Sequence, residues 1–471
     1  MEGRMSKLTD TLQRMTARIE NRAIPIRGGS SFAADPHETI GIATIKIVTE
    51  EQIQAIAYGR LDEPPKVIVR HNPLSRDVSD LLPFAEYLNE WADQVAATGG
   101  EGRVWTPHSD AIDTIDVLGH RYGFNDNAPA VVQRMGQVCR ILAHEARFPG
   151  QQIVADAKQL LSEHAITGLS PAEEGHLGAL LVWHDPGIPD KLQASRDAIR
   201  IPASGVLVNT PDFPGDETAE RCRRLIKTGS NEERAAAIAE METILERTVR
   251  REWRLMVDAR EAYLRLALPT SGLNDLTKRS FRRLANGLEA GFYPTRAPER
   301  IALELEDMNA GSALAEVATL EADPVVRERA AQEGRAFVGT VTAIDQVKPN
   351  RNPCTLHVTS AQAVNRLRLS DRVQFAGSNV TGIIRSITAT DDNGTCLEIE
   401  LTKGVRTKSI VCLGASVCVI KSAYANVRIS IFNEVKSRQP WAFYGDTPPV
   451  LSASQPSPET PLDIAKRSRR A

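Results

Sequence analysis

The chain has 471 residues, 42% of them hydrophobic and 25% charged, and its formal net charge is −3. These values are ordinary for a globular protein of roughly three domains. No run of 18 or more apolar residues occurs, and the start of the chain lacks the apolar stretch of a secretory signal, so we expect a cytoplasmic protein with no membrane partner. The six cysteines show no paired spacing, which excludes a disulfide scaffold.

Charge is distributed unevenly along the chain. Residues 1–215 carry a net charge of about −8, residues 216–335 about −2, and residues 336–471 about +7. The basic C-terminal end could attract a polyanion, although an excess of this size also occurs on surfaces that only face solvent.

Residues 1–100 have the signals of a mixed α/β region. Apolar residues recur every three or four positions over 8–19, as in a helix, whereas residues 39–48 alternate as in a strand. The alternation shifts by one position inside this strand. Either a bulge lies near Ala43 and Thr44, or the strand is buried on both faces. Residues 65–72 give a second strand candidate.

From residue 77 the apolar period becomes helical, and residues 101–210 are predicted to form a helical domain. Its probable helices cover residues 128–146, 150–165 and 170–183. Proline and glycine concentrate between 185 and 217, which favours a connector with several turns.

Residues 211–335 are predicted to form a long-helix stalk. Ser230 and Glu233 have the spacing of a capping box, and Pro269 supplies a stop. The apolar residues between them lie mostly on one face, so we expect one nearly continuous helix over 230–268. Residues 298–334 are its expected antiparallel partner.

Residues 336–432 are predicted to form a small, OB-like antiparallel β-barrel. Seven short segments with period-two alternation are separated by turns rich in Gly, Pro, Asn and Asp, and the last segment is residues 427–432. The tail, residues 433–471, is rich in Pro and Ser and is expected to be mostly disordered. The predicted fold class is therefore α+β and multidomain: a mixed α/β and helical N-terminal half, a long-helix arm and a C-terminal barrel.

The predicted barrel carries many cations and few aromatic residues that could stack on bases, so we expect contacts with a nucleic-acid backbone rather than with its bases. The candidate nucleic-acid-binding residues are Arg366, Arg368, Arg372, Arg385, Lys403, Arg406 and Lys408.

Residues 230–432, with the turn pattern from Leu367 to Val373, resemble the stalk and β-barrel accessory region of superfamily-1 helicases of the nonsense-decay type. In that family the barrel touches nucleic acid. The motor motif is missing, since no G-x-x-x-x-G-K-[ST] sequence occurs. The resemblance implies a non-catalytic accessory subunit that binds DNA or RNA and works with a separate motor or nuclease.

Two other functions remain open at this stage. The protein could be an interaction scaffold without nucleic-acid binding, or a divergent metal-dependent hydrolase. The second possibility depends on Asp113, Asp116 and His120, which share one face if their segment is helical. Such residues also occur as first-turn acids of a helix, and the cysteines of the predicted barrel lack the knuckle spacing of zinc sites, so we expect no cofactor.

Overall fold

The structure is a computed structural model that describes residues 7–47, 52–70, 77–201, 216–270, 272–291, 297–346, 354–362, 364–390, 394–407, 409–422, 430–438 and 445. Two compact units are present: Met1–Pro294 with Met308–Ala425, and Thr295–Asp307 with Asn426–Ala471. None of the described helices is long and apolar enough to cross a membrane.

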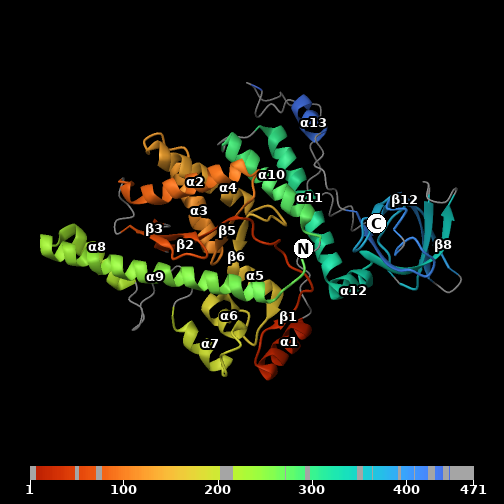
Figure 1. The fold of residues 1–471 in the computed structure, drawn as a ribbon, viewed down its shortest axis with the longest axis horizontal. Helices are drawn as coiled ribbons and strands as arrows, with labels where there is room; N and C mark the ends of the chain where they lie inside the picture. Colours follow the sequence, from red (N-terminus) through yellow and green to blue (C-terminus); the bar gives the residue numbers. More distant parts are fainter. Residues whose placement is uncertain are drawn as a thin grey trace, which may run out of the picture. The chain divides into compact units, whose positions relative to one another are not determined.

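The described helices and strands are shown in Figure 1. The helices are α1 (Lys7–Glu20), α2 (Leu82–Ala97), α3 (Ser109–Tyr122), α4 (Ala130–Glu145), α5 (Ala157–His164), α6 (Leu177–His184), α7 (Lys191–Ile199), α8 (Asp216–Thr228), α9 (Asn231–Arg265), α10 (Asn274–Ala290), α11 (Pro298–Ala322), α12 (Pro324–Gln332) and α13 (Ser430–Arg438). The strands are β1 (Ile24–Pro25), β2 (Glu38–Ile47), β3 (Gln52–Arg60), β4 (Lys66–Val69), β5 (Gly102–Thr106), β6 (Val154–Asp156), β7 (Ala165–Ile166), β8 (Ala336–Gln346), β9 (Cys354–Ser360), β10 (Arg372–Phe375), β11 (Thr381–Ala389), β12 (Thr395–Lys403) and β13 (Ser416–Lys421).

A five-stranded mixed sheet organises the N-terminal half, with strand order β4-β3-β2-β5-β6. Strands β2, β3 and β4 form an antiparallel meander, while β5 lies parallel to β2 and β6 parallel to β5. The predicted separation of 1–100 from 101–210 is therefore wrong at this point, because β5 and β6 complete the sheet that β2 begins. Both strands are short and buried at every position, so they show no alternation.

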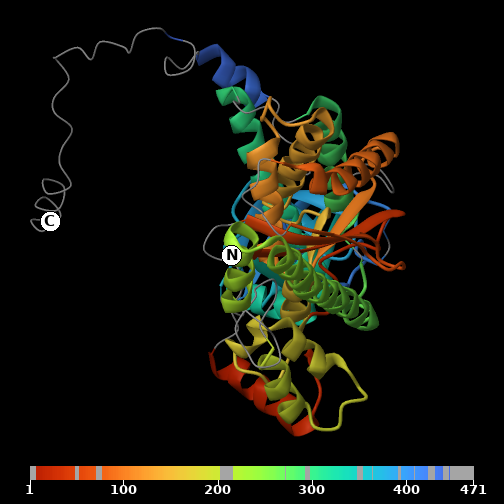
Figure 2. The same ribbon diagram turned by 90° about the vertical axis from the view of Figure 1, so that its left-hand side faces the viewer.

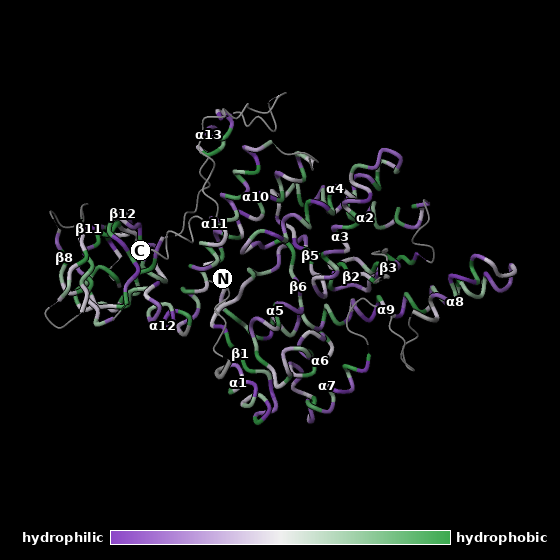
Figure 3. The backbone as a smooth tube through the Cα atoms, turned by 180° about the vertical axis from the view of Figure 1, so that it is seen from behind, coloured by the Kyte–Doolittle hydropathy of each residue, from purple (hydrophilic) through white to green (hydrophobic). Residues whose placement is uncertain are grey.

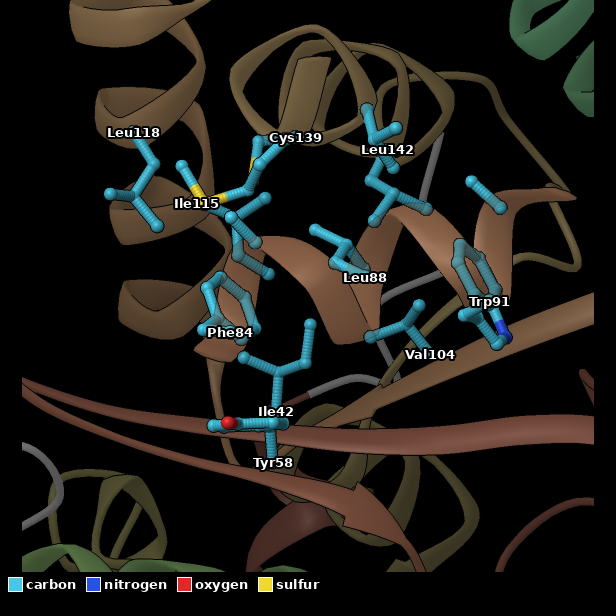
Figure 4. Close-up of a cluster of buried hydrophobic side chains, with 14 of the residues drawn as sticks. Ile42, Tyr58, Phe84, Leu88, Trp91, Val104, Ile115, Leu118, Cys139 and Leu142 are labelled. Atoms are coloured by element: carbon cyan, nitrogen blue, oxygen red, sulfur yellow. The ribbon is translucent and has the colours of Figure 1, made fainter. Parts of the chain in front are cut away.

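The central strand β2 is buried on both faces, as one of the two sequence alternatives predicted. Ile40 and Ile42 belong to a core shared with α2, α3 and α4. Figure 4 shows Ile42 pointing toward Phe84 and Leu88 of α2. Ala43 and Ile45 face the opposite core. A register shift occurs, but between Ile45 and Lys46.

Helix α9 covers this opposite face of the sheet (Figures 1 and 2). It runs unbroken for 35 residues from the predicted capping box of Ser230 and Glu233. Hydrophobic and hydrophilic positions alternate along it (Figure 3), and Trp253 and Met256 join the core below β2. The long helix is thus confirmed, whereas its predicted packing on residues 298–334 is wrong: the sheet needs cover on both faces, and α9 supplies it.

The part of α11 that belongs to the first unit, from Met308 onward, instead packs on turns and loops of that unit. Ala318 shares a small core with Leu273 and Leu276. A Cβ atom at position 29 would lie 2.2 Å from the Cβ atom of Ala322, so only glycine allows this approach. Leu320 of α11 and Ala330 of α12 pack on β8 and β13, which are the first and last strands of the C-terminal sheet in chain order.

That C-terminal sheet consists of six antiparallel strands in the order β10-β11-β12-β9-β8-β13, and β13 pairs back to β10. We call β8–β13 the strand ring. Inward positions alternate with outward ones, and the interior is filled by 15 buried apolar side chains, including Phe337 and Phe375. Six of the seven predicted strands are confirmed.

The seventh predicted strand is wrong in its described part, because residues 430–432 begin helix α13. In the second compact unit this helix places Phe432 under the guanidinium group of Arg300, with 5.6 Å between the guanidinium carbon and the ring centroid. The predicted disordered tail therefore contains a helix up to Arg438, and its remainder, apart from Gly445, lies outside the described residues.

Candidate nucleic-acid interface

Three of the predicted cations lie on the segment that leads into β10. Arg366, Arg368 and Arg372 are exposed, while Leu367 and Val373 between them are buried in the strand ring. Alternation around these two apolar anchors therefore directs the arginines to solvent. In the described part of the chain, none of the three guanidinium groups has a carboxylate partner.

The segment is held firmly at its start. The Gln362 side-chain amide donates to the carbonyl oxygens of Ala331 (2.7 Å), Ala336 (2.9 Å) and Val364 (2.6 Å). The Arg366 backbone N–H donates to the Gly334 carbonyl at 2.9 Å. These bonds tie the segment to the end of α12 and the start of β8.

A tight turn follows at residues 368–371. The Asp371 N–H donates to the Arg368 carbonyl (3.1 Å), and the Arg368 N–H donates to the Asp371 carboxylate (2.8 Å). Asp371 also forms an ion pair with Lys421 at 3.3 Å. The Asp371 carboxylate therefore pairs with Lys421, while the flanking arginines have no carboxylate partner in the described ranges of the chain.

The fourth predicted arginine, Arg385, forms an ion pair. Arg385 of β11 is exposed, but its Nε atom lies 2.6 Å from Oε2 of Glu400 on the neighbouring strand β12. Glu398, two residues earlier on β12, also faces outward. The outer face of β11 and β12 is therefore not uniformly basic, and it suits a polyanion less well than the segment that leads into β10 does.

Lys403 and Arg406 lie at and just beyond the C-terminal end of β12. Lys403 pairs with Thr381 at the start of β11, four residues from Arg385, which is about 13 Å along a strand. Arg406 is exposed in the turn beyond β12. The structure thus places Arg366, Arg368 and Arg372 on one segment, the arginine edge, and pairs Arg385 with Glu400. Lys403 and Arg406 belong to neither group, and Lys408 lies outside the described residues.

Stacking platforms are missing from the described part of the strand ring. Phe337 and Phe375 were candidates, and both are fully buried in its interior. The ring of His357 lies 2.7 Å from the Asp345 carboxylate. Tyr424, the remaining candidate, lies outside the described residues. The arrangement offers cations for phosphate without aromatic surfaces for unpaired bases.

Comparison with known proteins supplies no family. No protein-family model matches the chain, and no curated protein or solved structure matches it. Function must therefore be inferred from the residues of this chain.

Two of the three residues predicted to bind a metal, Asp116 and His120, contact arginine side chains instead. Helix α3 does place Asp113, Asp116 and His120 along its length. However, Arg147 binds the Asp116 carboxylate at 2.9 Å, and Arg140 lies 2.7 Å from Nδ1 of His120. Among the described residues, no three His, Cys, Asp or Glu side chains form a group that could hold a metal ion.

Sequence reasoning missed Leu369, which is 62% exposed at the tip of the turn. Leu369 is two residues after the buried Leu367, and residues two apart on a strand point to the same face, so alternation alone would have placed it inside the ring. Its exposure follows from the turn, whose hydrogen bonds the sequence pattern does not show.

Proposed function

We propose that this protein is a non-catalytic, cytoplasmic accessory subunit that binds the phosphate backbone of a nucleic acid through Arg366, Arg368 and Arg372. One observation carries the proposal: three exposed guanidinium groups, with no carboxylate partner among the residues that the structure describes, lie within seven residues on a firmly anchored segment of the strand ring. Arginine is well suited to this role because its planar group binds phosphate oxygens in a bidentate manner.

The charge distribution supports the same conclusion. The basic C-terminal part is covalently joined to an acidic N-terminal half, so the local field, rather than the net charge of −3, would guide a polyanion to this edge. The resemblance to the helicase accessory region now rests on the strand ring alone, since α9 packs on the sheet. A separate motor or nuclease stays the predicted partner.

A protein-interaction scaffold is the second candidate. It is favoured by helix α1, which exposes Leu12, Met15 and Ile19 on one face. In that case the arginine edge would be an ordinary solvated surface, and the full chain would not retain nucleic acid.

The test is the affinity of the full chain for a fluorescently labelled duplex of mixed sequence, measured by anisotropy at low salt. Changing Arg366, Arg368 and Arg372 together to Glu should weaken binding by at least about a hundredfold, because three attractive contacts become repulsive. All sequences should be affected equally, since phosphate contacts read no bases.

A matched control changes the same amount of charge elsewhere. Arg224, Lys227 and Arg234 are exposed on α8 and α9. Their combined change to Glu should alter affinity only slightly, and circular dichroism should show both variants folded. The proposal fails if the two triple variants bind alike, or if the wild type does not bind.

A further inference from the structure

An exposed leucine lies among the three arginines of the arginine edge. Leu369 is 62% exposed and is adjacent to Arg368, with Arg366 and Arg372 three residues away on either side. Leucine at such a position gains nothing from the core of the ring. A single exposed apolar residue is common on a protein surface, and what distinguishes Leu369 is its place between three exposed arginines.

The turn that carries Leu369 is rigid. Besides the two hydrogen bonds between Arg368 and Asp371, the Ser370 N–H donates to the Ile384 carbonyl (2.9 Å), and the Ile384 N–H donates to the Asp371 carbonyl (3.1 Å). The C-terminal half of the turn is therefore bonded to β11. The backbone that carries Leu369 is held by these bonds and does not have to be ordered on binding, which lowers the cost of contact.

The turn also contains an unfavourable backbone conformation. Ser370 has φ of 68°, in the left-handed region that glycine occupies more readily. Strain of this kind persists where the surrounding structure enforces it, and it is frequent at binding sites. Here it is the conformation of Ser370 that turns the chain back to β10 directly after Leu369.

We propose that Leu369 is an apolar wedge that inserts at a base step in the minor groove of a duplex, while Arg366, Arg368 and Arg372 bind the flanking phosphates. This inference rests on the function proposed above and adds the substrate class. An apolar side chain between phosphate-binding residues is the means by which minor-groove proteins partly unstack and kink a duplex. A single strand fits less well, since the described ring exposes no aromatic side chain for stacking.

The test uses the full chain and a duplex that contains 2-aminopurine at a central TA step, where unstacking raises its fluorescence and deformation is easiest. The wild type should raise the fluorescence on binding. Leu369→Ala should abolish that rise and weaken affinity about three- to tenfold, with an unchanged salt slope, because the phosphate contacts stay. Leu369→Phe, which keeps a wedge, should retain the rise.

Leu413 provides a matched control. It is 67% exposed in another turn of the ring, where no residue from 409 to 417 is charged. Leu413→Ala should behave as the wild type in both measurements. A wild type that binds without unstacking, or a Leu369→Ala variant that unstacks normally, would overturn this inference and leave phosphate binding intact.

Two further outcomes concern the partner class. No binding of any duplex by the wild type would overturn the proposed function together with the wedge. Co-sedimentation with vesicles of phosphatidylserine and phosphatidylcholine, lost in Leu369→Ala and without duplex binding, would assign the turn to a lipid surface and overturn the proposal.

Discussion

At the residue scale, a buried histidine shows how the N-terminal half fixes a protonation state. Nδ1 of His164 lies 2.7 Å from the Leu160 carbonyl oxygen and therefore carries the hydrogen, and Nε2 accepts the Ser31 N–H at 3.1 Å. A proton on Nε2 would point at the Ser31 N–H group, which is itself a donor. Burial, with a smaller repulsion from Arg27, lowers the pKa of His164 to about 4.

This shift predicts a loss of stability in mild acid. Below pH 6.5 the unfolded chain takes up a proton at His164, whereas the folded chain does so only near pH 4, so the free energy of unfolding falls as the pH falls through this window. The expected contribution is about 2 kcal/mol between pH 7 and pH 5.

Urea unfolding of the wild type and of His164→Gln at these two pH values measures the contribution. The variant is less stable at pH 7, but its further loss at pH 5 should be about 2 kcal/mol smaller than that of the wild type. His37→Gln, at an exposed side chain, is the control and should keep the wild-type difference. Equal losses in wild type and His164→Gln would contradict the assignment.

At the element scale, the contact between α9 and β2 decides how the long helix is used. Its start was predictable, because the capping box is a local signal that the structure reproduces. Its packing partner was not, since a one-sided apolar stripe fits a sheet as well as another helix. Gly41 of β2 lets the two elements approach closely: a Cβ atom there would lie 2.8 Å from Cζ3 of Trp253 and 2.5 Å from Cε of Met256.

Gly41→Ala should therefore destabilise the protein by about 1–3 kcal/mol, as overpacking of a filled core does. The Met256 side chain can move, but the indole of Trp253 cannot shift without displacing α9. Gly175→Ala is the control, because nothing lies within 4 Å of its added Cβ atom. Thermal unfolding of the two variants compares them directly, and equal melting temperatures would mean that α9 does not hold the sheet this closely.

At the scale of the whole molecule, the sequence predicted what depends on local alternation and missed what depends on distant pairing. Six strands of the ring were recognisable because each alternates and ends in turn residues. The mixed sheet was only half recognised, since β5 and β6 are buried at every position and each pairs with a strand at least 50 residues earlier in the chain.

In the candidate site, too, the features set by local alternation were predictable and those set by pairing between strands were not. The exposure of Arg366, Arg368 and Arg372 follows from their alternation with buried neighbours, and the structure agrees. The pairing of Arg385 with Glu400 depends on a register shift inside the β11–β12 ladder, which no sequence pattern specified. The pairing of neighbouring strands thus decides that Arg385 lies beside a carboxylate.

The central claim is that this edge of the ring binds phosphate, and the salt dependence of binding tests it most directly. Log affinity for a duplex should fall linearly with log salt for the full chain, and changing Arg366, Arg368 and Arg372 to Ala should reduce the magnitude of the slope by ~2.7, the counterion release of three phosphate contacts. Arg385→Ala alone should change the slope little, because Glu400 already neutralises that side chain. An unchanged slope in the folded triple variant would contradict the account.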